Sequence, residues 1–125
     1  MMPNNQWPEL CRIAREVSER LIRELPISMR SLISRIPIVF QTAPPPESCK
    51  DGLAPDTMGL FVGADYNHES DDPIPPEIIL YLQTIYDEAD GDPVRFREEV
   101  RITILHEIGH YLGLDEDDLF KRDLD

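Results

Sequence analysis

Two histidines and a glutamate lie close together in the last fifth of the sequence. Residues 106–110 are His-Glu-Ile-Gly-His, which is the pattern H-E-x-x-H. In an α-helix, residues four positions apart are separated by about 40° around the axis and by one turn. The imidazoles of His106 and His110 can then reach one tetrahedral ion at about 2.0–2.1 Å. The spacing therefore predicts that both are ligands of a zinc ion.

Glu107 has the chemistry and the position of a general base. On a helix it is rotated by about 80° from the mean direction of His106 and His110. Its carboxylate can stand beside a metal ion without binding it, where it can take a proton from a metal-activated water. We predict that Glu107 is the catalytic residue.

A third ligand is expected from the acidic residues that follow Gly113. A glycine there lets the helix end and the chain turn beneath the metal. In H-E-x-x-H-x-x-G-x-x-Z, the last position lies ten residues after the first histidine, and Glu116 occupies it. Asp117 and Asp115 are the second and third choices, because neighbouring carboxylates reach the metal after a small change in the turn.

The segment HEIGHYLGLDEDDL resembles the signature of small, single-domain bacterial zincin-like metallopeptidases. Similar segments precede it, namely GLFVG, PPEIILY and REEVRITILHEIGH, so the resemblance covers roughly residues 58–120. It implies a minimal zincin fold and a zinc-dependent peptidase with His106 and His110 as ligands and Glu107 as the base. Glu116 stands where the family has Asp, which keeps the ligand type and adds one methylene.

Other residues could support such a site. Thr103 precedes His106 by one turn and could hold a ligand in place, or bond its own helix backbone instead. Tyr111 is expected to pack rather than to take part in catalysis. A supporting role is also open for a loop histidine and three further tyrosines, which are His68, Tyr66, Tyr81 and Tyr86.

The remaining sequence predicts an α+β protein. Apolar residues at helical spacing indicate a helix over 8–25, and the segment 27–35 is ambiguous. Apolar, β-rich segments predict strands over 36–40, 58–63 and 77–83, with loops over 43–57 and 64–76. Asp92 and Pro93 are typical of a helix start, and a long helix is expected up to Leu112, followed by a short helix within 114–125. We predict a small mixed sheet packed against the helix that carries the site.

Length and charge restrict the partners. The 125 residues correspond to one domain, over residues 1–125. With 12 basic and 25 acidic residues, the net charge of −13 disfavours nucleic acid and anionic membranes as partners. It either attracts cations, such as a metal ion or basic peptides, or serves only to keep the protein in solution. The expected partner is a peptide or protein substrate, with basic peptides among the candidates. The N-terminal segment does not resemble a signal peptide and there are only two cysteines, which predicts a cytoplasmic protein.

Two functions follow from these features. The first is a zinc metallopeptidase, with a substrate strand lying along an edge strand above the site helix, either 58–63 or 77–83. The second is a metal-binding regulatory or interaction module without turnover. The glutamate at position 107 favours the first, because a purely structural metal site has no use for a base.

Overall fold

The computed structural model describes residues 6–63 and 75–113. Within them the elements are α1 (Gln6–Glu24), α2 (Ile27–Ile33), β1 (Ile38–Gln41), α3 (Pro46–Lys50), β2 (Gly59–Val62), β3 (Glu77–Tyr81), α4 (Leu82–Glu88) and α5 (Pro93–Leu112). This arrangement confirms the predicted α+β class with a small sheet. The expected helix within 114–125 lies outside the described residues.

The described strands form a mixed sheet in the order β1-β3-β2. Strand β1 is parallel to β3, with Ile38 opposite Ile78, and β2 is antiparallel to β3, with Gly59 opposite Leu80. Because β3 is central, its residues 78–81 are buried on both faces of the sheet. The expectation that the segment 77–83 could be an edge strand is therefore wrong. Among the described strands, the segment 58–63 supplies an edge strand, which is β2.

The third strand is also shorter than predicted. It ends at Tyr81, and α4 begins at Leu82. The side chains of Leu82, Ile85 and Ala89 are fully buried. Their spacing is helical, so the helix rather than a longer strand brings all three into the core. The predicted loop 43–57 likewise contains the one-turn helix α3, with Pro46 in its first turn.

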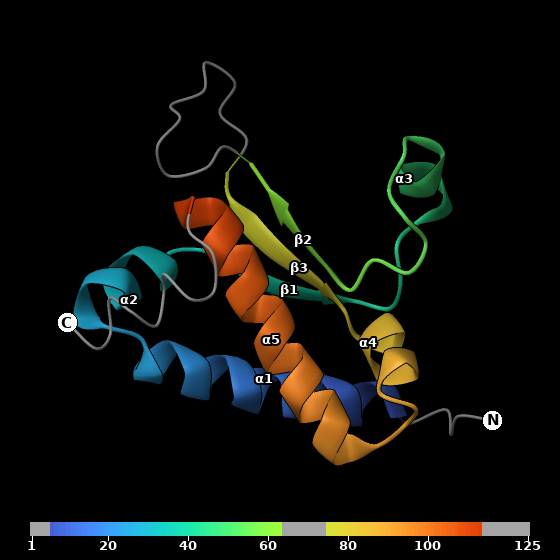
Figure 1. Cartoon of the computed structure of the whole chain (residues 1–125), viewed down its shortest axis with the longest axis horizontal. Coiled ribbons are helices and arrows are strands. Elements are labelled where there is room, and N and C mark those ends of the chain that lie inside the picture. Colours follow the sequence, from blue (N-terminus) through green and yellow to red (C-terminus); the bar gives the residue numbers. More distant parts are fainter. Residues whose placement is uncertain (1–5, 64–74, 114–125) are drawn as a thin grey trace.

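The core lies between the sheet and the long helices. Helix α5 runs across one face of the sheet, and α1 crosses α5 in the view of Figure 1. Helix α1 contributes its apolar stripe, and α5 contributes Phe96, Val100, Ile104 and Ile108, all fully buried. None of the helices in these described ranges is long and apolar enough to span a bilayer.

Both ends of α5 are fixed by local chemistry that the sequence predicts. The Asp92 carboxylate accepts a hydrogen bond of 2.9 Å from the backbone N–H of Val94, and Pro93 is the first helical residue. Gly113 ends the helix with a φ of 70°, in the left-handed region. The metal-site motif therefore occupies the last two turns of a capped helix.

Substituting Gly113 should destabilise the protein through its backbone conformation. A Cβ in the left-handed region costs about 1–2 kcal/mol, and most for a β-branched residue. We expect Gly113→Val to lower the free energy of unfolding by about that amount in urea denaturation. Gly113→Asn is the matched control, because asparagine tolerates this conformation, and it should lose clearly less. Equal stability of the two variants would contradict this explanation.

Candidate metal centre

Helix α5 brings His106, Glu107 and His110 together. One possible ligand atom from each residue lies within 4.8 Å of the others. The two imidazole rings have centroids 4.3 Å apart and planes inclined by 63°. Both histidines are exposed, whereas Glu107 is only 4 % exposed. The motif thus presents two accessible imidazoles beside one buried carboxylate.

The two histidines fit a divalent metal ion. Two ligand atoms on a tetrahedral zinc ion are separated by about 3.3 Å, given bonds of about 2.0–2.1 Å. Exposed imidazoles one turn apart can reach this separation by side-chain rotation alone. The Glu107 Oε1 atom lies 3.2 Å from Nδ1 of His110, so the carboxylate is in contact with a predicted ligand. Imidazole nitrogens are ligands that suit zinc.

Strand β2 covers Glu107 at Gly59. A Cβ on Gly59 would lie 2.5 Å from Cγ2 of Thr103, so close that one of the two groups would have to shift. It would lie 3.4 Å and 3.5 Å from Cγ and Oε2 of Glu107. The strand can pass this close to the helix only because residue 59 has no side chain. The catalytic candidate is therefore buried beneath the backbone of the edge strand.

A groove with a volume of about 420 Å³ opens between β2 and α5 at this point. Its lining consists of the three motif residues, Thr103, Ile102 and the strand segment 58–61. The sequence analysis named 58–63 as one of two candidates for the edge strand above the site helix, but it did not single out Gly59 as a contact with that helix. A signal was present, because a glycine inside an apolar strand often marks the close approach of another backbone.

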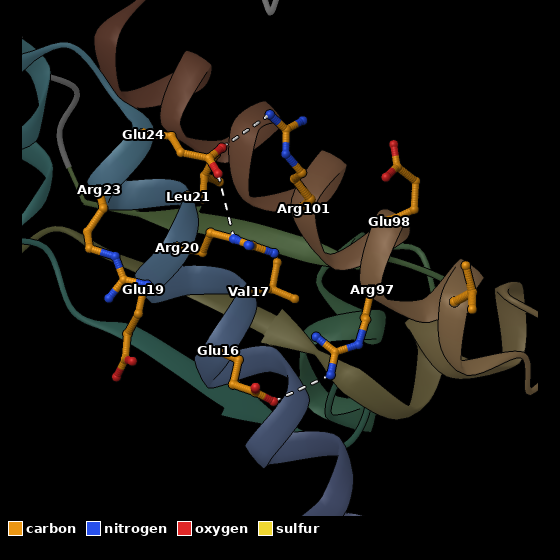
Figure 2. Close-up of a pocket in the computed structure, with 11 residues that line it drawn as sticks. Glu16, Val17, Glu19, Arg20, Leu21, Arg23, Glu24, Arg97, Glu98 and Arg101 are labelled. Atoms are coloured by element: carbon orange, nitrogen blue, oxygen red, sulfur yellow. Dashed lines mark hydrogen bonds and ion pairs between the residues drawn. The ribbon is translucent and has the colours of Figure 1, made fainter.

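A larger hollow of about 610 Å³ lies between α1 and α5 (Figure 2). Its lining includes four glutamates and four arginines and contains neither histidine nor cysteine. Arg97 and Glu16 form an ion pair of 3.4 Å across it, and Arg101 and Glu24 lie 4.0 Å apart. These opposite charges pair between the two helices, and the candidate metal-binding group found among the described residues lies in the smaller groove.

Of the other candidates from the sequence, some lie at the groove and some do not. Thr103 lines the groove, but its hydroxyl donates a hydrogen bond of 2.7 Å to the carbonyl of Glu99, on its own helix. Tyr111 packs on Phe61 with ring centroids 5.3 Å apart, as predicted.

Two tyrosines lie away from the groove. Tyr81 is buried in β3, where burial raises the pKa of its hydroxyl. Tyr86 packs edge-on against Phe96. Neither residue lines the groove. The remaining candidates lie outside the described residues, namely Tyr66, His68, Asp115, Glu116 and Asp117.

A family model described as zincin-like metallopeptidase matches residues 33–124. The chain belongs to this family. The match extends the resemblance seen at residues 58–120 toward the N-terminus, and it includes the whole sheet and the candidate metal centre on α5. Membership implies a divalent metal, and the histidines and glutamate of the motif are placed where they could hold one. A search of curated proteins finds no match.

The close packing in this zincin-like fold can be tested at Gly59. Gly59→Ala places a methyl group against Cγ2 of Thr103, and such overpacking costs about 1–3 kcal/mol of stability. Thr103→Ser removes Cγ2 while keeping the hydroxyl. We therefore expect Thr103→Ser to recover most of the stability in the Gly59→Ala background, as measured by a double-mutant cycle in urea. Additive losses in the double variant would show that this contact does not limit the packing.

Proposed function

We propose that this protein is a zinc-dependent peptidase. In this proposal His106, His110 and Glu116 hold the metal, and Glu107 is the general base. One observation carries it: a buried carboxylate lies 3.2 Å from one of two exposed imidazoles, and all three groups line an open groove. A structural metal site has no need of such a carboxylate or of such access.

The buried position of Glu107 suits proton transfer. When bound, zinc supplies a water of lowered pKa and polarises the substrate carbonyl. Glu107 accepts the proton of the attacking water and passes it to the leaving amine. Because β2 covers the glutamate, its carboxylate stays on the groove side of α5 and few orientations are open to it. His106 and His110, one turn apart on a capped helix, keep a fixed spacing.

The proposed substrate is an extended stretch of peptide or protein. Strand β2 pairs with β3 along one edge, and no other described strand pairs with its second edge. A peptide can add there as a further strand through backbone hydrogen bonds, which places one of its carbonyls over the groove. The net charge of −13 favours the approach of peptides that carry basic residues.

The general base can be tested by Glu107→Gln. The amide has nearly the same shape, cannot accept a proton and removes no histidine, so zinc content should stay the same. We expect the rate of hydrolysis of unstructured peptides to fall by a factor of about 10² to 10⁴. Glu98→Gln is the matched control, because Glu98 is exposed on the same helix outside the groove, and it should keep full activity.

Two results would contradict the proposal. Equal hydrolysis by Glu107→Gln and the wild type would assign the activity to another base or to a contaminant. Zinc-loaded wild-type protein that cleaves no peptide or denatured protein would instead favour a regulatory or interaction module.

The third ligand can be tested by measuring zinc affinity. We expect Glu116→Ala to weaken zinc binding more than Asp115→Ala or Asp117→Ala, because residue 116 has the ligand position of the motif. The loss should exceed the roughly 10–100-fold that follows from removing a residue that only supports a ligand. His106→Ala sets the scale for loss of a ligand. A larger loss in Asp117→Ala would show that the chain turns differently after Gly113.

A further inference from the structure

We propose that the groove beside the metal centre selects an apolar side chain of the peptide, adjacent to the bond that is cleaved. The proposal rests on the proposed peptidase function and adds the substrate class to it. Peptides with leucine, isoleucine, methionine or phenylalanine at this position would be cleaved in preference to those with lysine or glutamate.

Ile102 is the first observation that points to this selectivity. It is 37 % exposed, although it is a large hydrophobic residue, and it lines the groove. It precedes His106 by four residues, so the two side chains lie on the same side of α5, one turn apart. An apolar side chain is thus left uncovered beside a predicted metal ligand, where a substrate side chain can bury it.

The opposite wall of the groove is also apolar. Strand β2 and the residue before it contribute Met58, Gly59, Leu60 and Phe61. Phe61 is held by its contact with Tyr111, and Met58 packs against the core, so this wall is formed by anchored residues. A volume of about 420 Å³ is near the lower end of the roughly 300–1,000 Å³ of small-molecule sites. The groove is therefore suited to one or two side chains.

The described residues that line the groove offer little to a charged substrate side chain. Among the described residues that line it, Glu107 is the only carboxylate, and there is no lysine or arginine. Glu107 is buried and committed to the metal centre in the proposed function. A lysine or glutamate side chain that packs against Ile102 and the segment 58–61 would lose hydration without gaining a counter-charge from these residues, which costs free energy.

The negative net charge of the chain acts on peptides at longer range than the groove, which acts by direct contact. A net charge of −13 attracts basic peptides from solution, but at physiological salt this attraction is screened beyond about 8 Å. The net charge therefore raises the rate at which basic peptides meet the protein. The groove instead distinguishes peptides by the side chain that it contacts. We therefore place basic residues, where the substrate has them, away from the cleaved bond.

The test uses a set of unstructured peptides that differ at one position beside a single cleavable bond. That position carries leucine, phenylalanine, lysine or glutamate, and mass spectrometry identifies the bond that is cut. We expect kcat/KM for leucine and phenylalanine to exceed that for lysine and glutamate by at least about tenfold, within the range of 10–200-fold that apolar pockets achieve.

The variant Ile102→Gln links this preference to the groove. It removes the exposed apolar surface without adding a charge or a metal ligand, so zinc content should not change. We expect the preference for leucine over lysine to fall at least about fivefold, since a methylene or two in an apolar pocket is worth about tenfold or more. Ile102→Leu should retain the preference. Val94→Gln is the matched control, because Val94 is 75 % exposed on the same helix outside the groove.

The outcomes separate this proposal from the peptidase function. Hydrolysis that requires Glu107 but shows no preference at this position, or a preference unchanged in Ile102→Gln, would overturn the apolar selectivity and leave the function standing. If the zinc-loaded protein cleaves nothing, methyl NMR spectra of the metal-free protein show whether the groove binds apolar side chains. Shifts of the Ile102 and Met58 methyl signals with the leucine peptide, and not with the lysine peptide, would support the groove as a binding site for apolar side chains. The absence of such shifts would overturn it.

Discussion

The close approach of β2 to α5 at Gly59 is the constraint on which the metal centre depends. A single methyl group on residue 59 would overlap with Thr103 and touch Glu107. Because the strand passes so near, it buries the glutamate and leaves His106 and His110 exposed beyond its edge. The same approach forms one wall of the groove. Burial of the base candidate, access to the imidazoles and the shape of the groove therefore share one cause.

Helix α5 both packs against the core and exposes the two histidines, because its helical period places these residues on different faces. Ile104 and Ile108 are completely buried and fasten the helix to the core, while His106 and His110 face solvent. Residues four apart stay on one side of a helix, so each pair has a face of its own. Glu107 lies between the two faces, and its burial follows from that position. A site built on a packed and capped helix keeps its geometry better than one built on a loop.

The sequence predicted those features that depend on nearby residues. The ends of α5 follow from Asp92 and Gly113, whose effects act within one turn, and the H-E-x-x-H spacing has meaning only on a helix. The boundary between β3 and α4 was predicted wrongly because Leu82 fits both periods: it continues the alternation of the strand and also begins the buried face of the helix. The local sequence pattern cannot decide between strand and helix at Leu82. The packing of α4 on α5 favours the helix.

The groove could be predicted only in outline, because its two walls are distant in sequence and 58–63 was one of two candidates for the strand above the site helix. Residues 58–61 and Ile102 meet only once the sheet order is β1-β3-β2, with β2 at the edge nearest the metal centre. Strand order follows from how the whole core packs, which no short segment specifies. The glycine at position 59 was visible in the sequence, but its meaning depends on which backbone approaches it. In the proposed function, the sequence of α5 specifies the base and two of the metal ligands, whereas the tertiary contact between α5 and β2 determines the choice of substrate.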